Sequence, residues 1–251
     1  MLLQDRAAIV TGAGSGLGKA IARAFVRNGA RVVVNDLTME AAQQAITEMP
    51  FPERCVAVAG SVTAAETIRA LAATCVDSFG RLDIVVNNAA ILPPGLVKTQ
   101  AVADWKQTFE VNVLAPLALV QAALPALKRS PAARVINISG EIALSGMMFQ
   151  AAYGASKAAL NSLTKSMSRA LGKYGVSVNS ICPGIVTETN MVQEFVRDRP
   201  EYAAAFKLYH ENSPLGRGLR ATDIADVALM LASDQAAFLT GQFVRANGGA
   251  C

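Results

Sequence analysis

The chain has 251 residues, of which 52% are apolar and 17% charged, with a formal net charge of +4. This length is sufficient for one large domain with a sizeable core, and the basic residues are too evenly spread to indicate nucleic-acid binding. The single histidine, His210, and four scattered cysteines without a C-x-x-C pair argue against histidine triads, metal sites and thioredoxin-like chemistry.

Short β-branched runs alternate with alanine-rich helical stretches along almost the whole chain. The runs are apolar throughout, as in a sheet covered on both faces. This alternation predicts a single α/β domain, residues 1–251, built on a doubly wound parallel sheet. In chain order we predict a strand at 7–11, a helix at 16–28, a strand at 31–35, a helix at 40–48, a strand at 54–58, a helix at 64–79, a strand at 82–87, a helix at 102–129, a strand at 134–138, a helix at 151–173, a strand at 176–181, a helix at 223–232 and a strand at 242–246.

Two irregular segments interrupt this alternation, at 91–99 and at 187–214. Both follow strands, so both emerge beyond the carboxyl ends of the sheet, where doubly wound proteins bind ligands. The second segment is long and rich in aromatic and aliphatic residues. We expect it to form a lid over a partly apolar substrate, with His210 as a surface or lid residue.

The sequence favours a soluble, cytoplasmic protein. Charged residues follow Met1–Leu3 at once, so no signal-peptide core forms there. The most apolar stretch, 111–127, contains two prolines and is shorter than the roughly 20 residues of a membrane span. Scattered cysteines in a chain of this length are typical of reduced thiols.

A glycine-rich loop joins the first strand to the first helix, at 11–18, and reads Thr-Gly-Ala-Gly-Ser-Gly-Leu-Gly. Glycines let backbone amides approach a pyrophosphate, which the helix N-terminus attracts. A Walker loop is excluded because Ala13 and Ala20 replace its glycine and its hydroxyl residue, and the G-x-G-x-x-G spacing fails at Leu17. The T-G-x-x-x-G-x-G pattern indicates a variant dinucleotide loop.

Asp36, at the end of the second strand, indicates which dinucleotide this loop binds. An acidic residue there accepts hydrogen bonds from the adenosine ribose and repels a 2′-phosphate. Ser15 and Leu37 stand where a basic residue would neutralise such a phosphate. The sequence therefore predicts NAD as the cofactor, rather than NADP.

Tyr153 and Lys157 lie four residues apart in a predicted helix, so they share one helix face. An ammonium group and a cationic oxidised nicotinamide would lower the pKa of the phenol from about 10. The phenol could then serve as a base in alcohol oxidation and as an acid in carbonyl reduction.

With these motifs in this order, the whole chain resembles the short-chain dehydrogenase/reductase family of single-domain Rossmann oxidoreductases. The resemblance implies Tyr153 as general acid/base, Lys157 as its partner and ligand of the nicotinamide ribose, and Asn112 as holder of a water in the proton relay. It also implies that Asn87 braces the fourth strand, and it implies no metal. The expected cofactor-binding residues are Gly12, Ser15, Gly16, Leu17, Gly18, Asp36, Ser61, Val62, Asn88, Ala89, Tyr153, Lys157, Pro183, Gly184, Ile185 and Thr187.

The chain departs from the family pattern in three places. Ser61 replaces an aspartate that usually meets the adenine, and Ala90 replaces a glycine. More seriously, Gly140 stands where a serine that orients the substrate is usual, thirteen residues before the tyrosine. Ser139 lies one residue earlier, and a shift of one residue in a strand turns a side chain to the opposite face.

Several residues remain candidates for the missing hydrogen bond: Ser139, counted here among the catalytic residues, or else Ser145 or Glu141. The leading hypothesis is an NAD-dependent oxidoreductase that transfers a hydride between the nicotinamide and a small-molecule alcohol or ketone. The alternative is a family member that binds NAD without dehydrogenase chemistry and acts as a binding or scaffold protein. The resemblance further implies a homodimer or homotetramer, paired through the helices at 102–129 and 151–173.

Overall fold

A computed structural model describes residues 1–249, apart from the side chain of His210, and its centre is a seven-stranded sheet. The strands are β1 (Ala7–Val10), β2 (Arg31–Asp36), β3 (Cys55–Ala59), β4 (Ile84–Asn87), β5 (Arg134–Ile138), β6 (Ser177–Pro183) and β7 (Phe243–Ala246). Their order is β3-β2-β1-β4-β5-β6-β7, and every neighbouring pair is parallel. The predicted doubly wound parallel sheet is therefore confirmed.

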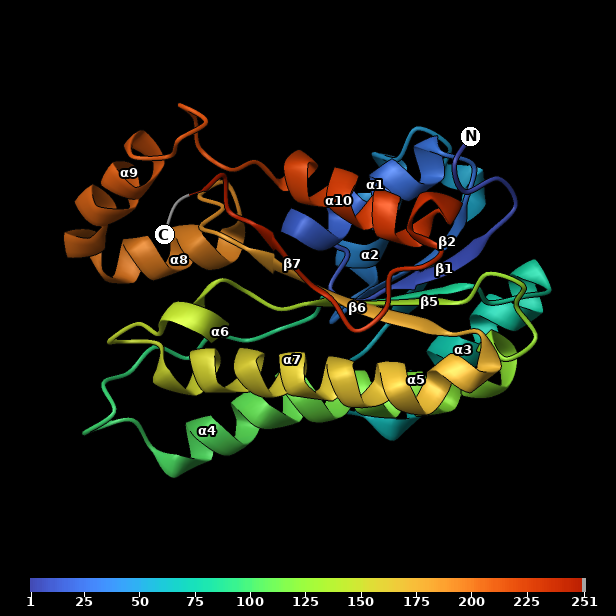
Figure 1. The fold of residues 1–251 in the computed structure, drawn as a ribbon, viewed down its shortest axis with the longest axis horizontal. Helices are drawn as coiled ribbons and strands as arrows, with labels where there is room; N and C mark the ends of the chain where they lie inside the picture. The colour runs from blue at the N-terminus through green and yellow to red at the C-terminus, as the bar shows by residue number, and fades with distance from the viewer. Residues whose placement is uncertain (250–251) are drawn as a thin grey trace.

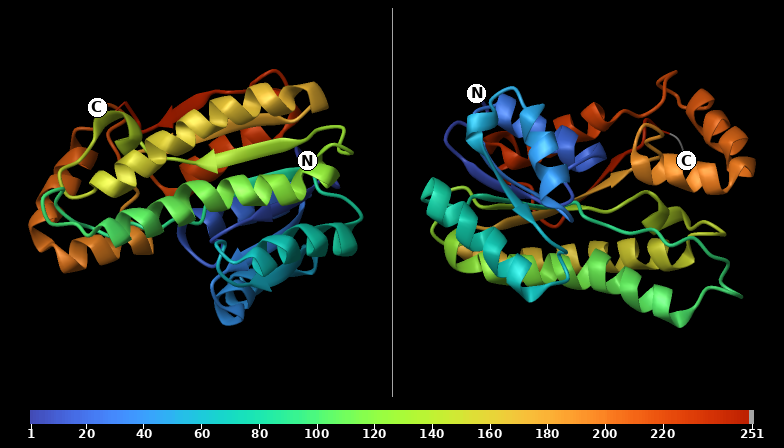
Figure 2. Two further views of the ribbon diagram at one scale, coloured as in Figure 1. Left: turned by 90° about the horizontal axis from the view of Figure 1, so that it is seen from below. Right: turned by 180° about the vertical axis from the view of Figure 1, so that it is seen from behind.

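Helices cover both faces of the sheet (Figures 1 and 2). One face carries α1 (Gly16–Arg27), α2 (Met39–Thr47) and α10 (Ala221–Ala232), and the other carries α3 (Ala65–Phe79), α4 (Val102–Phe109), α5 (Ala115–Leu127) and α7 (Ala151–Leu171). Successive strand residues point to opposite faces. Val34 accordingly belongs to the core with Phe25 of α1, and Val33 to the core with Leu71 of α3.

The predicted helix at 102–129 is one continuous run in which a π-helical turn, Glu110–Leu114, joins α4 to α5. The most apolar stretch, 111–127, which alone is shorter than a membrane span, is therefore part of a longer apolar helix. Val102–Leu127 has 26 residues and a mean hydropathy of 1.5 in its most apolar window, enough by length and composition to cross a membrane. It packs against α3 and α7, and 44% of that window is buried inside the protein.

The 187–214 segment, predicted to be irregular, contains two helices, α8 (Asn190–Asp198) and α9 (Ala203–Glu211). A short helix that the periodicity did not indicate, α6 (Ile142–Ser145), follows β5. These three helices lie together at one end of the sheet (Figure 1). Because β1 and β4 are neighbours from which the sheet grows in opposite directions, their carboxyl ends mark the switch point where such sheets bind ligands.

Candidate active site

Close backbone contacts shape the loop between β1 and α1. A Cβ at Gly18 would collide with the carbonyl oxygen of Gly12 and with the side chain of Asn88. A Cβ at Gly14 would lie 2.6 Å from Oδ2 of Asp36. The loop leads directly into the N-terminus of α1, whose unpaired N–H groups favour an anion.

Asp36 ends β2 beside this loop. Its Oδ2 accepts a hydrogen bond of 2.8 Å from the backbone N–H of Gly14, and its Oδ1 accepts one of 2.8 Å from that of Leu37. The carboxylate is half-buried. Each oxygen has a further lone pair, so the group is held in place and still able to accept hydrogen bonds from a ligand.

Hydrogen bonds tie the glycine loop to the end of β4. Nδ2 of Asn88 donates to the carbonyl oxygens of Thr11 and Gly12, at 2.9 and 3.0 Å. In return, Oγ1 of Thr11 accepts from the backbone N–H groups of Asn88 and Ala89, at 3.0 and 3.1 Å. Asn87 braces the neighbouring strand, since its Nδ2 donates to Oδ1 of Asn137 at 2.8 Å.

A nucleotide cleft of about 660 Å³ opens between these elements. Its size is that of a typical cofactor site. A carboxylate beside the loop and a free helix N-terminus beneath it fit the ribose and the pyrophosphate of a dinucleotide. Nine predicted cofactor-binding residues line this cleft: Gly12, Ser15, Gly16, Leu17, Asp36, Ser61, Val62, Asn88 and Ala89.

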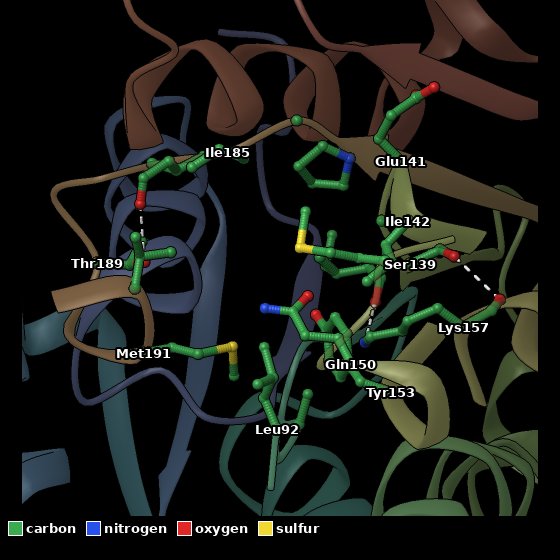
Figure 3. Close-up of a pocket in the computed structure, with 18 of the residues that line it drawn as sticks. Leu92, Ser139, Glu141, Ile142, Gln150, Tyr153, Lys157, Ile185, Thr189 and Met191 are labelled. Atoms are coloured by element: carbon green, nitrogen blue, oxygen red, sulfur yellow. Dashed lines mark hydrogen bonds between the residues drawn. The ribbon is translucent and has the colours of Figure 1, made fainter. Parts of the chain in front are cut away.

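A second cavity of about 220 Å³, the substrate cavity, adjoins the cleft (Figure 3). The two share five lining residues, namely Leu17, Asn88, Ala90, Thr189 and Met191. Tyr153, Lys157, Pro183, Gly184 and Ile185 line the substrate cavity. Thr187 lines neither space, whereas Thr189, which the sequence did not single out, lines both.

Tyr153 and Lys157 lie on one face of α7, with Nζ of the lysine 5.4 Å from the centre of the phenol ring. Nζ also donates a hydrogen bond of 2.7 Å to the carbonyl oxygen of Ile138 at the end of β5. Burial raises the pKa of Tyr153 to about 12 and lowers the pKa of Lys157 to about 7. Within the protein, burial therefore shifts the phenol pKa in the direction opposite to the one expected from its lysine neighbour.

Asn112 lies in the π-helical turn, a feature often found at functional sites. Its Nδ2 donates to the carbonyl oxygen of Ile91 and to Oγ of Ser156, both at 3.0 Å, and its Oδ1 accepts from the N–H of Ile91 at 2.9 Å. Asn112 thus joins the loop after β4 to the helix of the tyrosine. Ser156, adjacent to Lys157, was missed because only its tertiary partner distinguishes it from other helical serines.

Ser139 and Gly140 follow β5 at the edge of the substrate cavity. Oγ of Ser139 donates a hydrogen bond of 3.1 Å to the carbonyl oxygen of Lys157, and the residue is only 3% exposed (Figure 3). The hydroxyl group therefore faces the backbone of α7. Gly140 places no side chain in the cavity.

Aromatic residues hold the 187–214 segment over the substrate cavity. The ring of Tyr202 lies edge-on to Phe149, which precedes α7, and to Phe195 of α8, at centroid distances of 5.3 and 5.6 Å. Phe195 stacks on Phe206 of α9 at 5.8 Å. Phe195, Phe206 and Met191 also line the cavity, so this segment supplies much of its apolar wall.

No group of three or more possible metal-ligating side chains occurs among the residues that the structure describes. The cysteines within that part of the chain, Cys55, Cys75 and Cys182, form no disulfide. Cys251 lies outside the described residues.

Comparison with known proteins places the chain among oxidoreductases. A family profile described as enoyl-(acyl carrier protein) reductase matches residues 12–251. The chain is 34% identical to 3-oxoacyl-(acyl-carrier-protein) reductase FabG of Vibrio harveyi, over 99% of this chain and 98% of that protein. It is also 34% identical to an L-rhamnose 1-dehydrogenase (NAD(P)(+)) from a Sphingomonas species, over 99% and 97% of the two chains.

The fold agrees with these matches. A crystal structure of a short-chain dehydrogenase/reductase from Brucella melitensis, described as glucose/ribitol dehydrogenase, superposes with a TM-score of 0.91 at 31% identity, covering 100% of this chain and 98% of that one. The profile match, the relatives and this full-length structural agreement lead to one conclusion: the chain belongs to the short-chain dehydrogenase/reductase family, whose members bind a nicotinamide cofactor.

Proposed function

We propose that the protein is an NAD-dependent oxidoreductase that interconverts an alcohol and a ketone. One observation carries the proposal: a phenol and an amine, Tyr153 and Lys157, line a largely apolar cavity that opens into a dinucleotide cleft. A proton-transfer group and a cofactor site thus lie on either side of a space for a small molecule. The apolar wall from the 187–214 segment favours a partly apolar substrate.

The chain's own residues supply the proton transfer. When bound, the nicotinamide supplies the hydride acceptor or donor. With a pKa of about 12, Tyr153 is protonated at neutral pH, the form that donates a proton to a carbonyl oxygen in reduction. Oxidation requires the phenolate form of Tyr153, which accepts the proton of the alcohol, and neighbouring positive charge stabilises that form. Lys157, held against the Ile138 carbonyl, is the nearest source of that charge on α7.

The other predicted residues have supporting roles in this proposal. Asn112 holds the π-helical turn against Ser156, and in this proposal it would hold a water molecule of the proton relay. Ser139 fixes α7 through the carbonyl group of Lys157. Gly184 and Ile185, on the far wall from α7, would contact the nicotinamide.

Preference for NAD over NADP rests on Asp36. Its carboxylate is fixed beside Gly14, and a ribose 2′-phosphate placed there would meet like charge. Calorimetric titration is expected to show NAD binding at least about tenfold more tightly than NADP, or about 1.4 kcal/mol. Asp36→Ser should narrow that ratio. Equal affinities in the natural protein would contradict the assignment.

NADH formation with a panel of small secondary alcohols tests the reaction itself. The natural protein should turn over at least one of them, and Tyr153→Phe should abolish turnover in a protein that still binds NAD. If no member of the panel reacts in either direction although NAD binds, the oxidoreductase proposal is wrong.

One observation favours a second candidate, a protein that binds NAD without turnover. Gly140 lacks the usual hydroxyl group, and that of Ser139 is engaged with α7. This candidate predicts NAD binding without reaction, together with activity gained by Gly140→Ser. The retained Tyr153 and Lys157 favour the enzyme.

We further propose a homodimer or homotetramer. The helix that runs through α4 and α5 leaves Val102 and Leu114 exposed by 70% and 49%, although both are large and apolar. Burial of such residues against a second copy would stabilise a symmetric assembly. Size-exclusion chromatography with light scattering should give a multiple of 26.2 kDa, and a monomer mass would contradict the proposal.

A cytoplasmic location is proposed from the thiols. Burial raises the pKa of Cys55 and of Cys75 to about 12, which keeps both protonated and unreactive. A protein that needs no disulfide suits a reducing compartment. Fractionation of the source cells with antibody detection tests this placement.

A further inference from the structure

The three side chains named above as candidates to replace the missing serine already make other hydrogen bonds. The hydroxyl group of Ser139 donates to a backbone carbonyl in α7. That of Ser145 donates, at 3.3 Å, to the backbone carbonyl of Glu141. The Glu141 carboxylate pairs through both oxygens with Arg245, at 2.5 and 3.1 Å, and an ionised carboxylate has no proton to donate to a substrate carbonyl.

Gln150 is different, because it lines the same cavity and its side-chain amide makes no hydrogen bond to any of residues 1–249 (Figure 3). The residue is only 7% exposed. Its backbone is fixed, since its N–H donates to the carbonyl of Met147 at 3.2 Å and its carbonyl accepts from the N–H of Gly154 at 2.8 Å. The amide atoms are not among the fully enclosed side-chain atoms of the described residues, so they remain accessible from the cavity, where a substrate could pair with them.

The position of Gln150 strengthens this argument. It is the N-cap residue of α7, where Ser, Thr, Asp or Asn usually accept a hydrogen bond from the first turn, yet its side chain makes no capping bond. Helix capping therefore does not explain the amide. Tyr153 follows three residues later, in the first turn of α7, and both residues line the substrate cavity.

We propose that the Gln150 amide orients the substrate oxygen beside the Tyr153 phenol, in place of the serine that Gly140 lacks. The amide suits both partners of the reaction, because Nε2 can donate to a ketone oxygen and Oε1 can accept from an alcohol hydroxyl. Gln150 thereby becomes a substrate-contacting catalytic residue. This inference rests on the proposed oxidoreductase function.

The space around Gly140 allows a rescue experiment. A Cβ built at Gly140 would meet only Cγ2 of Ile142, at the ordinary contact distance of 3.4 Å, and the backbone there is not left-handed. Gly140→Ser therefore fits without displacing the chain. A serine at that position restores the family pattern and should make the Gln150 amide dispensable.

The test uses Gln150→Met, which keeps the length of the side chain and removes the amide. Steady-state kinetics should show kcat/KM reduced about 10²-fold, the scale of losing one donor to a reacting oxygen. The NAD dissociation constant and the melting temperature should stay close to those of the natural protein. Adding Gly140→Ser to this variant should recover most of the loss. Gln43→Met, at an exposed glutamine of α2 that lines neither the cleft nor the cavity, is the matched control and should retain full activity.

The outcomes separate the inference from the function on which it rests. No turnover by the natural protein on any substrate overturns both. Turnover that Gln150→Met leaves intact overturns the inference alone, as does a loss that Gly140→Ser fails to recover in a folded, NAD-binding double variant. Should Gln150→Met not fold, Gln150→Glu replaces it: the carboxylate keeps the size of the side chain, loses the donor, and should give the same loss in ketone reduction and the same recovery.

Discussion

Lys157→Met is expected to change how the stability of the fold depends on pH. Lys157 is 2% exposed, and burial lowers its pKa from 10.5 to about 7. Between these values the unfolded chain holds a proton at Lys157 that the folded chain has released. Stability therefore rises with pH in this window by up to about 1.4 kcal/mol per pH unit. From pH 7 to pH 9, the contribution of this side chain grows by roughly 2–3 kcal/mol.

Urea unfolding of both proteins between pH 6 and pH 9 measures this contribution. The stability of the natural protein minus that of the variant should change little near pH 6, where lysine is protonated in both states, and rise above pH 7. The window ends before Tyr153 titrates. Lys165→Met, which removes an exposed ammonium from the same helix, is the matched control. A difference that is constant from pH 6 to pH 9 would refute the reasoning and indicate that the Ile138 carbonyl keeps the ammonium charged.

Three further substitutions test the loop, the core and the cavity wall. Gly14→Ala should weaken NAD binding at least about tenfold by pushing a methyl group against the Asp36 carboxylate, and an unchanged calorimetric affinity would contradict this. Asp83 is fully buried, and burial alone would raise the pKa of its carboxyl group. Hydrogen bonds from Arg81 and other donors outweigh burial and lower that pKa below 3.8. The ionised carboxylate therefore stabilises the fold at neutral pH, and this stabilisation is lost on acidification. Asp83→Asn should cost about 1–3 kcal/mol in urea unfolding at pH 7 and reduce the loss of stability at low pH, and an unaltered acid profile would argue against it. Tyr202→Ala removes two edge-on aromatic contacts worth about 0.5–1.5 kcal/mol each, so substrate KM should rise several-fold at constant NAD affinity; an unchanged KM would show that these contacts do not shape the cavity.

The proton-transfer pair illustrates how far spacing alone can be interpreted. The four-residue separation of Tyr153 and Lys157 predicts a shared helix face, and the structure has them there. From this spacing we also expected the ammonium, together with an oxidised nicotinamide, to lower the pKa of the phenol. That expectation took no account of burial. In the folded chain both side chains are removed from water, which disfavours the charged form of each.

The serine that Gly140 lacks shows a second limit of prediction from sequence: a motif reveals a missing residue but does not identify the residue that replaces it. Counting back from the tyrosine identifies Gly140, and strand geometry predicts that Ser139 faces away from the site. The structure agrees, because the Ser139 hydroxyl group donates a hydrogen bond to the backbone carbonyl of Lys157 in α7. Gln150 was overlooked because the motifs used in the sequence analysis do not include it; what distinguishes it is its place in the cavity wall and a side-chain amide without a hydrogen bond to residues 1–249.

Local patterns determined the parallel sheet, the glycine loop, the acidic end of β2 and the Tyr153–Lys157 helix face, because strand periodicity, turn stereochemistry and helical spacing each act within a few residues. The tertiary structure decided what depends on distant segments. It turned the 187–214 segment into two helices over a cavity and placed a π-helical turn at Asn112 within the predicted helix at 102–129. It also set the burial that lowers the pKa of Lys157 and left the Gln150 amide without a hydrogen bond to residues 1–249. Burial and hydrogen-bond pairing are properties of contacts between segments, which no local pattern contains.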